Sequence, residues 1–319
     1  MGNRHACRAF AAMPALALVL GGAQLGCAGN AQMGSSGDPS TESTGTSEQP
    51  LLSAEADHET CDQDADGGAM DDPPGDPSPS DCGATSTAAC RVSTTSSFRT
   101  FTTLQAAINA SSNNALITVN GHCAGATVSR RSNLTIQGPS PTGGCGFMGP
   151  GPRQLSATVD GISVLNSTNI LVRNLNLVNS VDGIAFVNST NPNVSCACAA
   201  HNSNDGVRMT GGTTGIFSQL LSELNGTGIE SNGTTSVIIT GNTVTANRGT
   251  GIFVRNATVQ NVSVNLVTNN GGPGILFQNV TASIASANTI RGNGDGLRNL
   301  IECIRSRNNS GNNVPRSCM

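Results

Sequence analysis

The chain has 319 residues with 39 glycines, no tryptophan or tyrosine and only 11% charged residues, a composition unlike that of an ordinary compact enzyme. All 16 basic residues are arginine, and 13 of the 20 acidic residues lie between Asp38 and Asp81. Residues 28–90 therefore carry a formal charge of −13, whereas residues 91–319, with 14 arginines and 7 acidic residues, carry +7, so the net charge of −4 hides two oppositely charged parts.

The first 26 residues are typical of an export signal, because Arg4 and Arg8 precede the apolar run AFAAMPALALVLGG, which is too short to span a bilayer. The stretch AQLGCAGN that follows resembles the cleavage site of bacterial lipoproteins, which would make Cys27 the lipidated first residue of the mature protein. The alternative is ordinary secretion after cleavage near Ala31. We expect an extracytoplasmic protein, either an outer-membrane or cell-surface lipoprotein held to the membrane only through its lipid anchor, or a secreted protein.

Residues 27–94 are predicted to form a flexible acidic tether, because they are rich in Ser, Thr, Pro, Gly and Asp and show no apolar periodicity that could bury a core. Within them, Asp62, Asp64 and Asp66 alternate as at the start of a calcium-binding loop, but Pro73 takes the place of the closing glutamate. Two interpretations stay open here, a calcium site or an acidic solvated linker.

Eleven cysteines are typical of a protein from an oxidising, extracytoplasmic compartment. One lies in the signal and Cys27 is the candidate lipid site, so nine remain, and at least one of these is free or pairs between molecules. Cys61 with Cys82 could close a loop of the tether, and Cys303 with Cys318 could close the C-terminus, but the sequence does not fix the pairing. There is no Cys-x-x-Cys pair, and the CAC motif has no partners at zinc spacing, so we expect no zinc site.

Glycine followed by an aliphatic residue recurs every 22 or 23 residues. The glycines in this position are Gly161, Gly183, Gly206, Gly228, Gly251, Gly274 and Gly296. Apolar residues alternate after most of them, which predicts a short strand with one buried face. Asn242, Asn265 and Asn288 form a second register, and we expect each in a turn with left-handed backbone, hydrogen-bonded to the asparagines above and below.

The repeat resembles that of the right-handed parallel β-helix family, the fold of pectate lyases, polygalacturonases and many bacterial surface proteins. The resemblance covers residues 95–319 and predicts an all-β solenoid of nine or ten coils. In this family a short amphipathic helix often caps the open core, and FTTLQAAINA fits it, followed by first strands in ALITVNG and NLTIQG. Because one fold hosts many activities, the repeat says little about function.

A candidate site follows from the repeat, because residues one coil apart stack about 4.8 Å from each other. Asp182 and Asp205 both precede a repeat glycine, and stacked carboxylates repel unless a cation, a proton or an arginine lies between them. Arg208 and Glu230 each lie two residues after a repeat glycine, so we expect them as neighbours on the outer face, with His201 close by.

Two interpretations of this cluster remain open. The resemblance to pectate lyases and polygalacturonases implies that Asp182 and Asp205 are metal ligands or acid and base, with Arg208 as base or carboxylate clamp. The Gly-His-Gly of the hydrolases is absent, since the residue after His122 is Cys123. The other interpretation is structural: aspartate before glycine is ordinary turn chemistry, and Arg208 with Glu230 is an exposed ion pair that stabilises little.

The positive charge of the coil region, carried wholly by arginine, favours capture of an anionic polysaccharide such as a uronate chain. Phe186 and Phe277 fall at inward positions, which weakens binding by aromatic stacking. We therefore expect a surface β-helix protein that engages anionic polysaccharide without catalysis. The alternative is a lyase or hydrolase acting on uronate glycans, with calcium as the candidate cofactor. No nucleic-acid partner is expected, because the arginines are scattered and no aromatic ladder accompanies them.

Overall fold

The structure is a computed structural model that describes Cys82, residues 86–140, Leu155 and residues 157–319. Several sequence predictions fall outside the described residues: the export signal, the lipid site Cys27, the possible disulfide partner Cys61 and the calcium motif of Asp62, Asp64 and Asp66. Within the described ranges, no helix has both the length and the apolar character that a membrane span requires.

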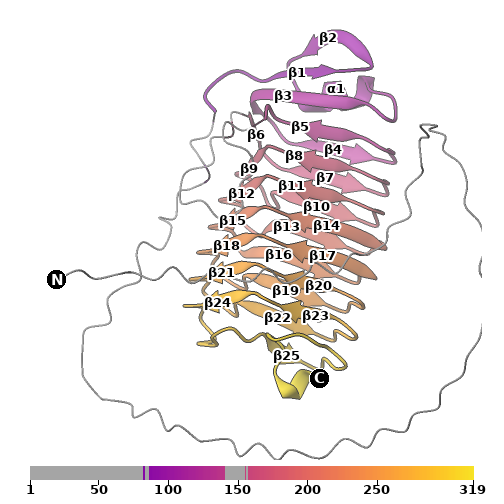
Figure 1. Cartoon of the computed structure of the whole chain (residues 1–319). Coiled ribbons are helices and arrows are strands. Elements are labelled where there is room, and N and C mark those ends of the chain that lie inside the picture. Colours follow the sequence, from indigo (N-terminus) through magenta and orange to yellow (C-terminus); the bar gives the residue numbers. More distant parts are fainter. Residues whose placement is uncertain (1–81, 83–85, 141–154, 156) are drawn as a thin grey trace, which may run out of the picture. The chain divides into compact units, whose positions relative to one another are not determined.

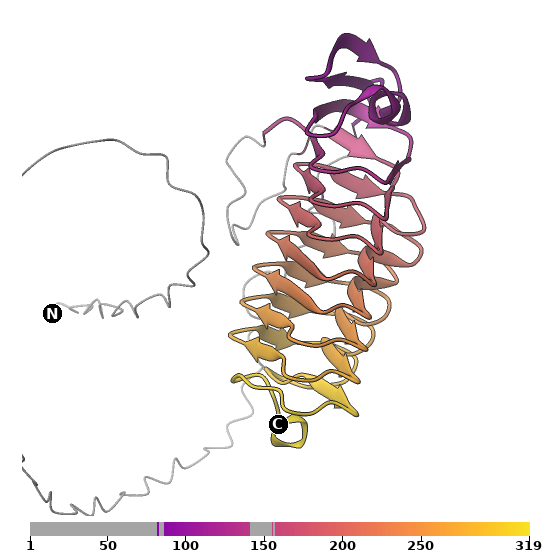
Figure 2. The same cartoon turned by 90° about the vertical axis from the view of Figure 1, so that its right-hand side faces the viewer.

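The described residues form a parallel β-solenoid of about eight turns, preceded by one short helix (Figure 1). Each turn runs through three short strands, and the turns stack along one axis in Figure 2. We call the separate eight-stranded sheet face 1, and the two other strand columns, which follow it in each turn, faces 2 and 3. The predicted fold class is confirmed. The turns number about eight rather than nine or ten, because the first residues of the region form a cap.

The strands of face 1 are β4 (Ala126–Ser129), β7 (Ile162–Leu165), β10 (Ile184–Val187), β13 (Asp205–Thr210), β16 (Thr227–Asn232), β19 (Ile252–Arg255), β22 (Ile275–Gln278) and β25 (Glu302–Ile304). Those of face 2 are β5 (Thr135–Gln137), β8 (Leu171–Arg173), β11 (Asn193–Ser195), β14 (Thr214–Ser218), β17 (Ser236–Thr240), β20 (Asn261–Ser263) and β23 (Ile284–Ser286). Those of face 3 are β6 (Ala157–Val159), β9 (Asn176–Val178), β12 (Cys198–Ala200), β15 (Leu221–Glu223), β18 (Thr243–Thr245), β21 (Leu266–Thr268) and β24 (Thr289–Arg291). The ends comprise β1 (Arg91–Thr94), β2 (Ser97–Phe101), α1 (Leu104–Ala110), β3 (Leu116–Cys123) and a 3₁₀ turn (Arg316–Cys318).

The N-terminal cap consists of α1 and the antiparallel strands β1, β2 and β3. Helix α1 begins after Thr103, whose hydroxyl accepts the N–H of Ala106, and it buries Leu104, Ala107 and Ile108 over the open end of the core. The predicted capping helix is thus confirmed. Strand pairing starts in β1, ahead of residue 95 where the sequence places the domain start, because Val92 and Thr94 turn inward against β3.

The repeat glycines of face 1 are explained by the close approach of successive coils. A Cβ atom at Gly206 would lie 2.6 Å from the carbonyl oxygen of Gly228, and one at Gly228 would lie 2.5 Å from that of Gly251. Contacts this short do not occur for real side chains, so only glycine fits. The aliphatic residue after each of the first six repeat glycines, such as Val207, is buried in the core. The seventh glycine, Gly296, does not fit this pattern, because it begins no strand and Leu297 after it is only partly buried.

Two ladders of buried asparagines run along the interior of the solenoid. One joins Asn242, Asn265, Asn288 and Asn313, and the other joins Asn202, Asn225, Asn247, Asn270 and Asn293. The amide of Asn242, for example, donates to Asn265 Oδ1 at 2.9 Å and to the carbonyl oxygen of Phe217 at 3.0 Å. The predicted stacking is confirmed, but the predicted left-handed backbone is wrong. That conformation falls on the preceding residues, such as Val264 (φ 58), because the asparagine side chains turn inward to satisfy buried carbonyls.

Three disulfides lie within the described residues, namely Cys82–Cys198, Cys90–Cys123 and Cys303–Cys318. The pairing of Cys303 with Cys318 is as expected from the sequence. The pairing of Cys82 with Cys61 is wrong, because the chain brings Cys82 against face 3. There its Cα lies 5.6 Å from that of Cys198, and its N–H donates to the carboxylate of Glu223 at 3.1 Å.

Candidate functional site

The outer surface of face 1 carries a row of side chains, one from each strand. The parallel register of β10, β13, β16, β19 and β22 places Ala185, Arg208, Glu230, Phe253 and Leu276 side by side. Each of them follows an inward-pointing valine or isoleucine of the core, so the alternation of a strand turns it outward.

Three carboxyl groups lie together on this face and are almost fully covered. The exposed fractions of Asp182, Asp205 and Glu230 are 8%, 1% and 6%. Asp182 Oδ1 accepts the backbone N–H of Asp205 at 3.2 Å and Nδ2 of Asn204 at 2.8 Å, while the same Nδ2 lies 3.0 Å from Asp205 Oδ2. Asp182 therefore ties its own coil to the next one, which is a structural role.

Two arginines pair with these carboxylates. Arg208 Nη2 lies 2.7 Å from Asp182 Oδ2, its Nε lies 3.8 Å from Asp205 Oδ2, and Arg255 Nη2 lies 2.6 Å from Glu230 Oε1. We call Asp182, Asp205, Arg208, Glu230 and Arg255 the charged cluster. The side chains of Arg208 and Arg255 are 33% and 39% exposed, whereas the carboxylates that they bind are buried.

The Asp205 carboxyl is unlike an ordinary aspartate in its protonation. Burial raises its pKa from 3.8 to about 7, and the charge of Glu230, a hydrogen bond with Glu230 and the charge of Asp182 act in the same direction. The positive charge of Arg208 opposes the rise of this pKa. With one proton on its three carboxyl groups, the cluster balances two positive charges against two negative ones.

Phe253 and Arg255 are the members of this face that the sequence analysis missed. The guanidinium carbon of Arg255 lies 5.3 Å from the ring centroid of Phe253, which is partly exposed beside Glu230. The signal was present in the repeat, because Phe253 lies two residues after Gly251, as Arg208 and Glu230 lie after their own repeat glycines.

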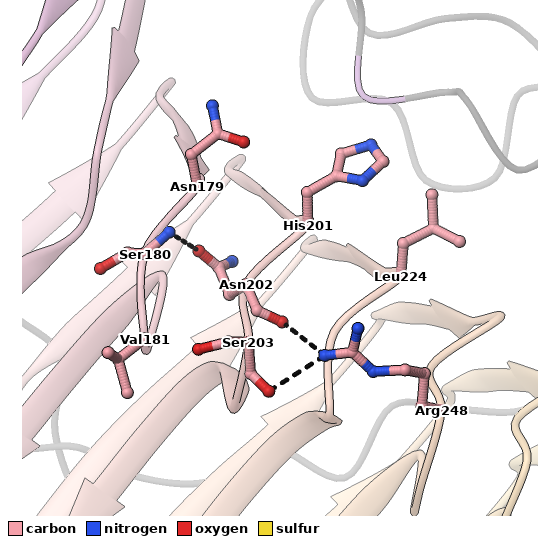
Figure 3. A pocket seen from close by; sticks show the side chains of 8 residues that line it. All are labelled: Asn179, Ser180, Val181, His201, Asn202, Ser203, Leu224 and Arg248. Carbon is pink, nitrogen blue, oxygen red and sulfur yellow. Dashed lines mark hydrogen bonds between the residues drawn. The ribbon is translucent and has the colours of Figure 1, made fainter.

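A pocket of about 670 Å³ lies on the corner of the solenoid between face 3 and face 1, where it spans neighbouring coils (Figure 3). It is lined by Asn179, Ser180, Val181, His201, Asn202, Ser203, Leu224 and Arg248. Arg248 Nη2 donates to the carbonyl oxygens of Asn202 at 3.3 Å and Ser203 at 3.0 Å. Val181 directly precedes Asp182, so the pocket and the charged cluster share their loops.

The structure brings together four of the five predicted catalytic candidates, Asp182, Asp205, Arg208 and Glu230, and places His201 in the neighbouring pocket. Arg208 and Glu230 are neighbours in register as predicted, but they are not an exposed pair with each other. Each pairs with a different partner because their side chains reach diagonally across strands.

The proposed role of Asp182 as a calcium ligand finds no support in its contacts. Its Oδ1 accepts two N–H groups and its Oδ2 is bound to Arg208. Calcium requires several oxygen ligands that are free to face the ion.

A family model described as "Periplasmic copper-binding protein (NosD)" matches residues 108–313 of this chain. The sequence matches none of the curated proteins with which it was compared. Among solved structures, it is similar to the periplasmic alginate epimerase AlgG, with 15% identity, a TM-score of 0.44, and coverage of 60% of this chain and 49% of the other. It is also similar to the enzymatically active domain of tailspike protein 2 from bacteriophage CBA120, with 14% identity, a TM-score of 0.40 and coverage of 60% and 32%. A third is the A-module of mannuronan C-5 epimerase AlgE4 from Azotobacter vinelandii, with 12% identity, a TM-score of 0.27 and coverage of 61% and 86%.

The chain spans about half the length of the first of these structures and about a third of the second. At such identities the likeness is one of fold alone.

Proposed function

The chain belongs to the NosD family of extracytoplasmic β-helix proteins, and on that premise we propose that it binds an anionic polysaccharide along the outer surface of face 1. The observation that carries this proposal is the pair of guanidinium groups of Arg208 and Arg255. Each guanidinium binds a buried carboxylate, and each of the two side chains is about a third exposed to solvent.

This arrangement suits recognition of carboxylate groups on a polymer. A guanidinium presents five N–H donors in a rigid fork, so an arginine that is paired on one edge retains donors on the other. The buried partners Asp182 and Glu230 hold the forks in place before a ligand arrives, which reduces the entropy lost on binding.

Two further features support a sugar ligand. Phe253 offers an outward-facing aromatic ring on the same strand as Arg255, and rings of this kind pack against the apolar faces of sugars. Outside the charged cluster, residues 91–319 contain 12 arginines and 4 acidic residues, which favours a polyanion over a neutral polymer.

The test is binding of the purified chain to a panel of uronate polymers and to a neutral glucan. Wild-type protein is expected to bind uronate polymers with an affinity that falls as the salt concentration rises, because screening weakens exposed arginine contacts. Arg208→Gln with Arg255→Gln should weaken binding at least tenfold, a loss of about 1.4 kcal/mol or more. Arg99→Gln, an exposed arginine of the cap, is the matched control and should leave affinity unchanged. Equal affinity for the neutral glucan would contradict the proposal.

A second candidate function, a lyase or hydrolase acting on the same polymer, is favoured by one observation. An Asp205 pKa of about 7, raised by burial and by the charge of Glu230, suits a general acid or base at neutral pH. We rank it below binding, because the Asp205 side chain is 1% exposed and a catalytic carboxyl must touch its substrate.

One assay separates the two functions. Uronate polymers are incubated with the protein, with and without calcium, while ultraviolet absorbance follows unsaturated chain ends and a colorimetric test follows reducing ends. A lyase produces both signals and a hydrolase only the second. If cutting occurs, Asp205→Asn should abolish it without loss of the fold, whereas a binder produces neither signal.

The family description mentions copper binding, but the described residues do not form a suitable copper site. Among them, the group with suitably spaced ligand atoms is Cys82, Cys198 and Glu223, whose atoms lie within 4.8 Å of one another. Cys82 and Cys198 form a disulfide, and copper is held by thiolate rather than disulfide sulfur. We therefore assign no copper-dependent step to this chain.

We also propose that Cys27 carries a lipid anchor and that residues 27–81 hold the solenoid away from the membrane. The predicted tether is shortened from residue 94, because Cys82 and β1 are bound to the solenoid. Cys27→Ala should release the protein from the membrane fraction, because the lipidated cysteine supplies the anchor. A variant as firmly membrane-bound as the parent would contradict the lipoprotein assignment and leave secretion or another anchor.

A further inference from the structure

We propose that the corner pocket around Arg248 is a subsite for a single uronic acid residue, with Arg248 receiving the sugar carboxylate. This inference rests on the proposed function and names the part of the polymer that the protein recognises. Four observations carry it: the contacts of the Arg248 guanidinium, the buried hydrogen bonds of Asn202, the mixed chemistry of the lining residues and the position of the pocket beside the charged cluster.

Arg248 differs from the two arginines of the charged cluster. Arg208 and Arg255 each pair with a carboxylate, whereas among the described residues no carboxylate lies within ion-pair distance of Arg248. Its Nη2 donates to two backbone carbonyls, which fixes the side chain across two coils, as Figure 3 shows. The Nε and Nη1 groups therefore keep donors for an anion.

The floor of the pocket is rigid. Asn202 is fully buried, belongs to an interior asparagine ladder, and accepts the backbone N–H of Ser180 at 3.1 Å. Because its carbonyl oxygen also accepts from Arg248, the guanidinium is positioned by the core rather than by a loose loop. A pre-positioned donor binds an anion with a smaller loss of side-chain entropy.

The walls of the pocket match both sides of a sugar ring. Ser180, Ser203 and Asn179 offer hydroxyl and amide groups to sugar hydroxyls, and His201 adds a ring with a further donor (Figure 3). Val181, which is 65% exposed, and Leu224 add apolar surface for the C–H face of the sugar. The volume of about 670 Å³ lies in the usual range of small-ligand sites.

The pocket adjoins the charged cluster through neighbouring residues of the same loops. Val181 precedes Asp182, and Ser203 is followed by Asn204, whose amide contacts both Asp182 and Asp205. A polymer lying across Arg208 therefore meets the pocket at the edge of face 1. One sugar unit would sit in the pocket while its neighbours contact face 1.

The test measures binding of a short uronate oligosaccharide and of its methyl ester to the full chain by calorimetry. Arg248→Gln should lower the affinity for the uronate oligosaccharide about tenfold, as expected for loss of a charge-assisted hydrogen bond. Its affinity for the methyl ester should stay that of wild type. Arg99→Gln, an exposed arginine of the cap, is the charge-matched control and should bind both ligands as wild type does. Val181→Phe should also lower the affinity for the uronate oligosaccharide, because the larger side chain fills the pocket without changing its charge.

The outcomes separate this inference from the proposed function. One outcome is that wild type binds the oligosaccharide, that Arg208→Gln lowers the affinity, and that Arg248→Gln and Val181→Phe bind as wild type does. In that case the subsite is wrong and the proposed function stands. If wild type binds no uronate ligand, both fall. If free acetate binds the protein as tightly as the oligosaccharide does and competes with it, the pocket is a simple anion site, and the assignment to a sugar residue is overturned. Circular dichroism of each variant checks that the fold is retained.

Discussion

Replacing Asp205 by asparagine should stabilise the protein in a pH-dependent way. The carboxyl has a pKa of about 7 in the folded protein, against 3.8 for the ordinary group. Between these two values the folded state binds a proton that the unfolded state has released, so the stability contributed by Asp205 falls as pH rises through this window and stays low above it. Asparagine has nearly the same shape and carries no charge at any pH.

The magnitude follows from the size of the pKa shift. A rise of about 3 units, at about 1.4 kcal/mol per unit, means that ionised Asp205 destabilises the folded state by at most about 4 kcal/mol. The variant should therefore match wild type at about pH 4 and exceed its unfolding free energy by up to about 4 kcal/mol at about pH 8. Glu230→Gln should lower the Asp205 pKa and so narrow the pH range over which the stability changes, because it removes a negative charge that helps to raise this pKa.

Urea unfolding followed by circular dichroism at three pH values measures this effect. Glu302→Gln is the matched control, because Glu302 occupies the same outward row on β25 but is partly exposed. A gain for Asp205→Asn that is the same at low and high pH would refute the assigned pKa. A loss of stability at high pH would show that the carboxylate is favourable in the charged cluster and would overturn the reasoning.

Three other predictions concern the scaffold. Asn225→Ala should lower the unfolding free energy by about 2–4 kcal/mol, because it leaves buried polar groups of the asparagine ladder unpaired. The control Asn256→Gly, in an exposed asparagine ladder, should change the urea midpoint of unfolding little. Gly206→Ala should yield insoluble protein, because its Cβ would lie 2.6 Å from the next repeat glycine's carbonyl oxygen; soluble protein with a native spectrum would contradict the packing argument. Cys318→Ala should destabilise the last turn by about 3 kcal/mol, the value for a loop of about 15 residues, and speed hydrogen exchange in β25 more than in β10.

The spacing of the glycines determined the fold before any coordinates were known. A coil can bury its inner face only against its neighbours, so a strict period of 22 or 23 residues fixes which residues stack. That same rule placed Asp182 beside Asp205 and Arg208 beside Glu230. The same rule places Phe253, two residues after Gly251, in the outward row.

The tertiary structure alone decided how these neighbours pair and which of them are covered. Periodicity gives the order of residues along a face, but a long arginine side chain reaches several positions, so it did not predict that Arg255 rather than Arg208 binds Glu230. Contacts outside the repeat were equally hidden. The Cys82–Cys198 disulfide joins residues 116 apart, and Arg248 reaches back across two coils to the carbonyl of Asn202. Such contacts depend on where irregular segments and side-chain rotamers come to rest, which no repeat encodes.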